Sequence, residues 1–218
     1  MPTAKLDLYK LHKAEYVARR QPALVRTRAA HYLAIAGAGR PGDETFAAQI
    51  GALYAVAFTV KMKRKFAGLQ DYAIGKLEAQ WLDDPATFAK RNVPWRWRLL
   101  MRSPDFLPPA DLAAAVAALL DKGKPATVKE VTLMTLDEGS CVQMLHIGPY
   151  DREPESIALM QAFVAGKSLV FAGSHHEIYL SDPRRILPER LKTILRVPVA
   201  ATSGCDKLQH PADRRPDG

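Results

Sequence analysis

One segment of the sequence combines ionisable and aromatic groups with a pattern typical of a β-strand. Residues 175–183 read HHEIYLSDP, and the alternation of side chains along a strand would place Glu177 and Tyr179 on one face. Ile178 and Leu180 take the other face and are expected to pack against a helix. The carboxylate and the phenol then face a second surface, which is either a ligand pocket or, for an edge strand, the solvent.

Aromatic residues elsewhere in the sequence could complete a ligand site around this carboxylate. Four side chains offer flat faces able to enclose a polyaromatic compound: Trp81, Trp97, Tyr150 and Tyr179. A carboxylate among them could neutralise a cationic ligand or, with its pKa raised by loss of water, act as a general base on a water molecule. Trp81 and Trp97 would fit a hydrophobic core equally well.

The sequence predicts neither a metal site nor a bound cofactor. His175 and His176 are neighbours on one strand and point to opposite faces, which prevents them from binding one ion together. Residues 37–42 read GAGRPG and match the dinucleotide-binding pattern G-x-G-x-x-G. Pro41 lacks the backbone N–H that would face a phosphate, and no acidic residue follows about 20 residues later to bind a ribose hydroxyl. We interpret this segment as a turn that leads into a helix.

The composition is that of a folded, basic protein. Its 218 residues are 48% hydrophobic, which is enough to bury a core. The net charge is +8, but the basic residues are spread out except at 61–65, behind a predicted helix. No nucleic-acid-binding motif accompanies this charge, and no run of about 20 apolar residues indicates a membrane helix. We therefore expect a cytoplasmic protein with reduced Cys141 and Cys205 and with neither nucleic acid nor membrane as a partner. Monomer and homodimer both remain open.

Periodicity and capping residues predict the main elements. Asp43 is a candidate N-cap for a helix over 44–61, Pro109 opens a helix over about 109–122, and Pro154 opens a third that Gly166 ends. Residues 1–22 are expected to form an N-terminal arm. One domain covers 23–198, and 199–218 is expected to be a disordered tail.

The order of predicted elements is the same in two parts of the domain. Residues 31–102 and 141–198 each read as strand, helix, strand with an acid, and strand with basic residues. Each part is a β-α-β-β unit whose helix covers one sheet face, so two copies related by a pseudo-two-fold axis could share a central groove. This α+β arrangement would place Glu78 and Glu177 at comparable positions on the two sides of the groove.

Three motifs, in the same order, resemble one family. They are MLHIGPYDREPE at 144–155, HHEIYLSDPRR at 175–185 and PERLKTILRVPV at 188–199. With ALYAVAF at 52–58 and WRW at 95–97, they make the chain similar to the stand-alone GyrI-like small-molecule-binding proteins over about residues 20–200. The resemblance implies a duplicated β-α-β-β fold, related to the SOUL haem-binding proteins, with a central groove for aromatic and often cationic ligands.

The resemblance implies more than one function. The first is a module that binds aromatic or cationic amphipathic molecules with Glu177 as polar anchor. The second is a cyclopropanoid cyclopropyl hydrolase, which detoxifies DNA-alkylating compounds by adding water to a strained ring, with Glu177 as general base and Tyr150 or Tyr179 holding a carbonyl. An inhibitor protein of gyrase type is the alternative. The candidate catalytic residues are Glu177 and Tyr150, and the candidate ligand-binding residues are Glu78, Trp81, Trp97, Tyr179 and Tyr54.

Overall fold

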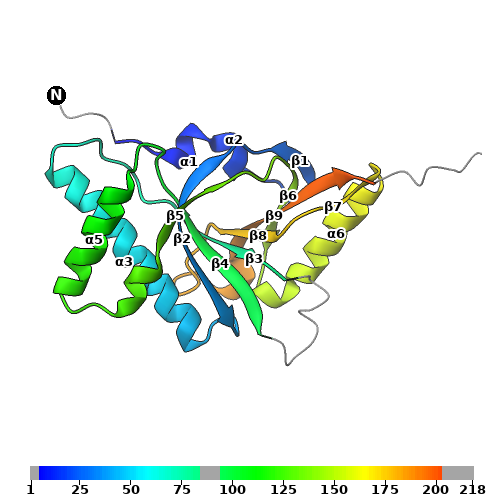
Figure 1. Cartoon of the computed structure of the whole chain (residues 1–218). Coiled ribbons are helices and arrows are strands. Elements are labelled where there is room, and N and C mark those ends of the chain that lie inside the picture. Colours follow the sequence, from blue (N-terminus) through cyan, green and yellow to red (C-terminus); the bar gives the residue numbers. More distant parts are fainter. Residues whose placement is uncertain (1–4, 84–93, 203–218) are drawn as a thin grey trace, which may run out of the picture.

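The computed structural model describes residues 5–83 and 94–202, which form the α+β domain that the sequence predicts (Figure 1). The helices are α1 (Leu8–Leu11), α2 (Lys13–Tyr16), α3 (Glu44–Phe66), α5 (Pro109–Asp121) and α6 (Glu153–Ala165). The strands are β1 (Ala23–Arg26), β2 (Ala30–Gly39), β3 (Leu77–Trp81), β4 (Trp95–Arg102), β5 (Thr132–Leu136), β6 (Ser140–Ile147), β7 (Leu169–Phe171), β8 (His175–Tyr179) and β9 (Lys192–Ala201).

The nine strands form one open sheet in the order β1-β6-β9-β8-β3-β4-β2-β5, with β7 also pairing with β9. All of these strand pairs are antiparallel. The pair β3–β8 joins the two halves of the sheet, since β4 and β2 lie on one side of it and β9 and β6 on the other. The duplication with pseudo-two-fold symmetry stays a prediction.

Helix α3 begins as the sequence predicts and ends later. The side chain of Asp43 accepts a hydrogen bond from Phe46 N at 2.8 Å and so caps the amino end. The helix continues beyond the expected end at 61, so the basic cluster lies within its last turns, where cations interact favourably with the helix dipole. Lys61 pairs there with Asp71 at 2.8 Å, and Arg64 pairs with Asp111 of α5.

By length and apolar composition, α3 is the one helix among the described residues that could cross a membrane. Its inner face is packed instead against the sheet. Leu53 and Val56 are fully buried with Leu99 of β4 and Ala115 of α5 in the largest hydrophobic cluster. Burial of this kind is the behaviour expected of the core helix of a folded domain.

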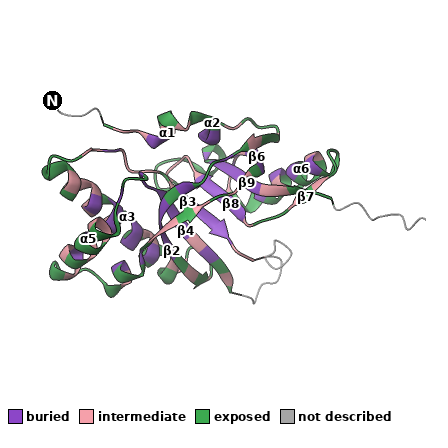
Figure 2. Ribbon diagram, turned by 45° about the horizontal axis from the view of Figure 1, so that its top comes forward, coloured by how far each residue is buried: buried purple, intermediate pink, exposed green. Residues whose placement is uncertain are grey.

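The long helices cover the face of the sheet that carries Glu177. The strand register pairs Ala79 with Glu177 and Glu177 with Leu195, so these three side chains share one face. Leu195 packs with Met160 of α6 on that face. Figure 2 shows the buried strands between α3 and α5 on one side and α6 on the other. Ile178 packs against a helix as expected, but on the far face, in a cluster with Tyr16 of the short helix α2.

The glycine-rich segment at 37–42 is partly strand rather than only a turn. Gly37 and Gly39 belong to β2 and pair with Trp97 and Trp95 of β4. A Cβ atom at Gly37 would lie 2.6 Å from Trp97 Nε1, which is closer than two such atoms can approach. Glycine at this position therefore lets the indole pack over the strand, and no phosphate is needed to explain it.

The two ends of the domain differ in detail from the predicted boundaries. Strand β9 continues to Ala201, past the expected boundary at 198, because β7 pairs with residues 199–201. The rest of the expected tail, with Cys205, lies outside the described residues, whereas Cys141 is buried and free. Helices α1 and α2 belong to the expected N-terminal arm.

Candidate functional site

Glu177 lies near the middle of the sheet and is 7% exposed. Trp81 Nε1 donates a hydrogen bond to its Oε1 at 2.6 Å, and the Tyr179 hydroxyl donates one to Oε2 at 2.7 Å. His175 Nε2 lies 3.3 Å from Oε1. Burial alone would raise the pKa of this carboxyl, but the contacts with the histidine, the phenol and the indole outweigh burial and hold the pKa below its usual value. Glu177 is therefore ionised at neutral pH. Of the two roles that the sequence leaves open for this carboxylate, the lowered pKa favours an ionised partner for a cation over a base with a raised pKa.

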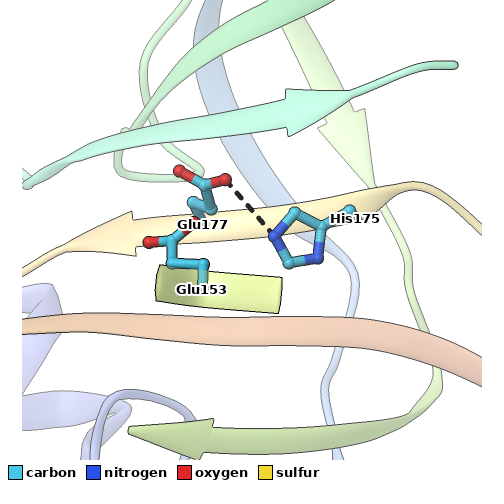
Figure 3. Close-up of side chains that lie close together, drawn as sticks. All are labelled: Glu153, His175 and Glu177. Atoms are coloured by element: carbon cyan, nitrogen blue, oxygen red, sulfur yellow. Dashed lines mark ion pairs between the residues drawn. The ribbon is translucent and has the colours of Figure 1, made fainter. Parts of the chain in front are cut away.

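Glu153, which the sequence did not single out, lies beside this carboxylate. It is the first residue of α6 and is 6% exposed. One ligand atom from each of Glu153, His175 and Glu177 lies within 4.8 Å of the other two, and Figure 3 shows the three side chains converging. Burial, and then the charge of Glu177, raises the pKa of Glu153 to about 10. Two adjacent buried carboxyls resist double ionisation, so Glu153 holds the proton.

Aromatic rings continue from this acid pair in both directions along the sheet. Phe46 of α3 stacks on Trp81 with ring centroids 6.0 Å apart and meets Trp97 edge to face at 5.0 Å. On the other side, Tyr179 meets Tyr150 edge to face at 5.9 Å. The predicted residues Trp81, Tyr179 and Tyr150 are thus brought together around Glu177.

Trp97 and Tyr54 differ from this group in exposure. Trp97 is fully buried and donates a hydrogen bond to Gln49 at 2.7 Å, so it is a core residue behind Trp81. Tyr54 on α3 is 43% exposed and Tyr150 is 39% exposed. Both phenols lie within electrostatic range of Asp182, which follows β8. Tyr150 is therefore the exposed member of the aromatic group, and Tyr54 is an exposed phenol on α3 that shares the influence of Asp182 with it.

Glu78 lies on the opposite face of the sheet from Glu177. In the register of β3 and β8 it pairs with Ile178, the neighbour of Glu177, and it is fully buried. Its carboxylate lies 3.0 Å from His176 Nε2 and accepts a hydrogen bond from the Tyr16 hydroxyl at 3.2 Å. The expectation that Glu78 and Glu177 face each other across one groove is therefore wrong, because adjacent strands here place them on different faces.

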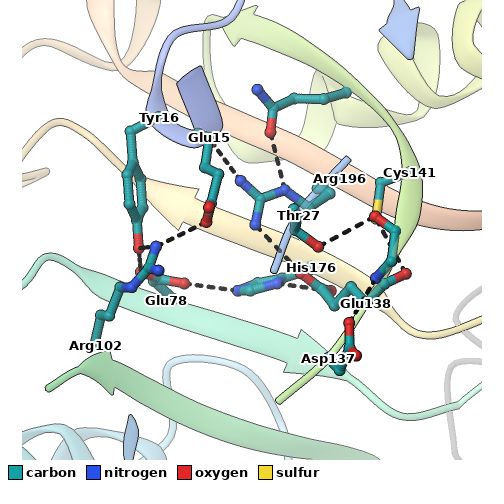
Figure 4. A network of polar contacts seen from close by, with 12 residues as sticks. Glu15, Tyr16, Thr27, Glu78, Arg102, Asp137, Glu138, Cys141, His176 and Arg196 are labelled. Carbon is teal, nitrogen blue, oxygen red and sulfur yellow. Dashed lines mark hydrogen bonds and ion pairs between the residues drawn. The ribbon is translucent and has the colours of Figure 1, made fainter. Parts of the chain in front are cut away.

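Figure 4 shows that Glu78 belongs to a buried polar network beneath the N-terminal segment. His176 Nδ1 lies 3.0 Å from Glu138, which also accepts a hydrogen bond from Arg196 at 3.2 Å. Burial disfavours the charged imidazole, but Glu138 and then Glu78 outweigh it and raise the pKa of His176 to about 9. Burial opposes the ionised form of Glu138 as well, yet His176 and Arg196 lower the pKa of Glu138 to about 2. The network is a set of compensated charges inside the domain.

Two features bear on what the molecule could hold. Glu153, His175 and Glu177 together offer the donor atoms of a metal site. A separate open hollow of about 420 Å³ lies at the other edge of the sheet and is lined by Leu24, Val25, Arg26, Ser140, Leu169, Val199, Ala200 and Ala201. This hollow contains none of the acids, histidines or aromatic residues described above.

The arrangement defines an α+β protein with a buried, aromatic-lined acid pair on the helix-covered face of an antiparallel sheet, consistent with a GyrI-like fold. Solved structures support this description. The chain is 34% identical to an uncharacterized conserved protein from Listeria innocua, with a TM-score of 0.84 over 90% of this chain and 100% of that one. It is 33% identical to a hydrolase from Listeria innocua, with a TM-score of 0.83 and the same coverage. This chain therefore belongs to the same family as these two Listeria proteins.

A more distant structure shares the fold alone. The C-terminal domain of EcmrR is 13% identical, with a TM-score of 0.55 over 83% of this chain and 98% of that domain. No family model matches the sequence, and no curated protein does.

Proposed function

We propose that the protein binds aromatic or cationic amphipathic small molecules on the helix-covered face of the sheet, with Glu177 as the polar anchor. The observation that carries the proposal is the ionised, almost fully buried carboxylate of Glu177 among Trp81, Tyr179 and Tyr150. A buried charge without a counterion is costly, and a cationic aromatic ligand would supply both the charge and the flat faces that these rings pack against.

The strand residue paired with Glu177 is the small Ala79, while the larger Trp81 lies one alternation further along β3. A ligand would approach from the side of Tyr150 and Tyr54, whose phenols are exposed. This site is where we expect the groove that the resemblance implies.

The reaction we propose for the same site is the hydrolysis of a cyclopropane ring conjugated to a carbonyl. It is supported by the relative described as a hydrolase and by the acid pair. Water forms a C–O bond at a ring carbon, the ring C–C bond breaks, and its electron pair moves to the carbonyl oxygen, which takes up a proton. Glu177 would accept the proton that the water loses, and Tyr150 would donate a hydrogen bond to the carbonyl oxygen. Detoxification in a bacterial cytoplasm is the corresponding cellular role.

The binding proposal is tested by titration with a matched pair of probes. Tryptophan fluorescence is followed while tetraphenylphosphonium, a cation, or triphenylphosphine oxide, a neutral analogue, is added to wild type and to Glu177→Gln. Loss of a buried charge partner costs about 2 kcal/mol or more, so the variant should bind the cation roughly 30-fold more weakly. Its affinity for the neutral analogue should change by no more than about 2-fold. Glu155→Gln, an exposed acid of α6, is the control. Equal weakening for both probes would remove the anchor role.

The hydrolysis proposal is tested by incubating the protein with a cyclopropane-bearing, duocarmycin-type alkylator and following the water adduct by mass spectrometry. Wild type should form the adduct catalytically, and Glu177→Gln should turn over ~100-fold or more slowly, which is the range for loss of a general base. Binding of the probe without any water adduct would leave a binding protein and reject the enzyme.

A further inference from the structure

We propose that Glu153, His175 and Glu177 form a binding site for one divalent transition-metal ion, for which Zn²⁺ is the probe. Imidazole nitrogen and carboxylate oxygen are both ordinary zinc ligands. The three candidate ligand atoms already lie within 4.8 Å of one another. Atoms bound to one tetrahedral Zn²⁺ lie about 3.4 Å apart, so a small side-chain adjustment would bring them into coordination range.

One buried oxygen of the cluster lacks a partner. Glu153 Oε1 has no hydrogen-bond partner among the described residues, and Glu153 is 6% exposed. His175, which is 5% exposed, has its Nε2 3.3 Å from Glu177 Oε1. Buried polar atoms are almost always satisfied, so an unsatisfied oxygen beside an imidazole and a second carboxylate points to a missing ligand.

Charge balance also favours a divalent ion. Glu153 would give up its proton on binding a metal, and a divalent cation between the two carboxylates would make the cluster neutral. The hydrogen bonds from Trp81 and Tyr179 fix the orientation of the Glu177 carboxylate, as outer residues do in metal sites. His176 points to the other face, so His175 is the histidine available on this one. The prediction of no metal site considered the histidines as a pair and did not include Glu153.

Three protein ligands would leave a position open for a water or for an oxygen of a bound molecule, as in catalytic zinc sites. That role in a reaction rests on the proposed function. Metal binding itself does not, so the two can fail separately.

The test is a Zn²⁺ titration of chelator-treated, full-length protein by isothermal calorimetry, with the metal content checked by mass spectrometry. We expect one Zn²⁺ per chain. Because loss of an outer-shell residue alone weakens binding by about 10- to 100-fold, loss of a direct ligand in Glu153→Gln or His175→Ala should weaken it by at least ~100-fold. Tyr179→Phe should weaken it by about 10-fold. Glu155→Gln, in the same turn of α6 as Glu153, and His31→Ala, an exposed histidine, should bind as wild type does.

Two further measurements keep the result interpretable. Zn²⁺ should raise the Tm of wild type, since a ligand that binds only the folded state stabilises it. This measurement uses wild type alone, so it tests metal binding even if a variant fails to fold. The tetraphenylphosphonium titration is repeated on metal-free protein, so that ligand binding without metal binding is recognised. No stoichiometric Zn²⁺ binding by wild type, or unchanged affinity in a folded Glu153→Gln, would overturn the metal site.

Discussion

At the scale of single residues, the numbers of hydrogen-bond donors distinguish the two acids of the site. Glu177 accepts hydrogen bonds from an indole and a phenol, which stabilise its negative charge. Glu153 has an oxygen with no such donor and is buried to a similar extent. The same burial therefore leaves one carboxyl ionised and the other neutral.

Removal of the phenol should show this effect directly. In Tyr179→Phe the Glu177 carboxylate loses the donor at 2.7 Å, so its ionised form is less stable and the pKa of Glu177 should rise. Carbon-13 NMR of labelled glutamate side chains, recorded across a pH titration, measures the change. Tyr54→Phe removes an exposed phenol on α3 and should leave the pKa unaltered. An unchanged pKa in Tyr179→Phe would mean that the phenol does not stabilise the charge.

Some features of the site followed from the sequence and others depended on packing. Strand alternation predicts correctly that Glu177 and Tyr179 share a face. Glu153 gave no signal, because an acid beside Pro154 in the first turn of a helix is ordinarily explained by the helix dipole. Its closeness to Glu177 arises from tertiary packing, which brings the start of α6 next to β8. The placement of Glu78 on the other face depends on the register between β3 and β8, which residue patterns within each strand do not specify.

At the scale of elements, the N-terminal segment is attached to the far face of the sheet by buried charges. Arg102 of β4 donates a hydrogen bond to Glu15 at 2.7 Å and another to the Tyr16 hydroxyl at 3.2 Å. Arg196 of β9 donates to the backbone oxygen of Glu15 and is 1% exposed. Helix α2 thus provides the partners of Arg102 and one of the partners of Arg196.

Loss of the Glu15 carboxylate should therefore be strongly destabilising. In Glu15→Ala, Arg102 stays buried without its charge partner, which costs about 3–5 kcal/mol of unfolding free energy. Urea denaturation provides the measurement. The matched control is Glu155→Ala, whose partner Arg152 is exposed, and its effect should be much smaller because solvent screens an exposed pair. Equal effects of the two substitutions would show that α2 does not depend on this pair.

The sequence predicted elements better than it predicted their ends and partners. The N-cap Asp43 and the periodic apolar residues identify α3, and Pro109 and Pro154 identify the starts of α5 and α6 to within a residue. The end of α3 was placed too early, because basic residues read as the polar segment after a helix. The short strand β7 was missed, since its three residues form a strand only through pairing with β9.

At the scale of the whole molecule, the buried ionisable groups give stability an optimum on the acid side of neutrality. Glu138 and Glu78 outweigh the cost of burial and raise the pKa of His176 from 6.5 to about 9. The cation Arg196 shares Glu138 with this histidine. The charged imidazole therefore stabilises the fold fully below pH 6.5. This contribution is lost as the pH rises through about 9. Glu153, with its pKa raised from 4.5 to about 10, also favours the folded state less as the pH rises above 4.5.

Glu138 acts at the other end of the pH scale. Its pKa is lowered from 4.5 to about 2, so its contribution is present above pH 4.5 and is lost as the pH falls through about 2. The Tm should therefore be highest near pH 4.5 and should fall below it as Glu138 takes up a proton. Above pH 4.5 it should fall gradually because of Glu153, and more steeply above pH 6.5 where His176 adds to the loss, as measured by calorimetry in buffers of equal ionic strength. A Tm that rises steadily from pH 6.5 to 9 would contradict the charge assigned to His176.

The long sequence separation of these contacts has a consequence for how fast the chain folds. Gln143 donates a hydrogen bond to the backbone of Val17, 126 residues earlier, and Arg196 reaches Glu15, 181 residues earlier. Among the described residues, β1 likewise pairs only with β6. The contacts of α2 and β1 therefore cannot form until distant segments of the chain have come together. Non-local pairing of this kind makes folding slow and leaves strand edges open to aggregation, so this protein should fold slowly and should benefit from chaperones.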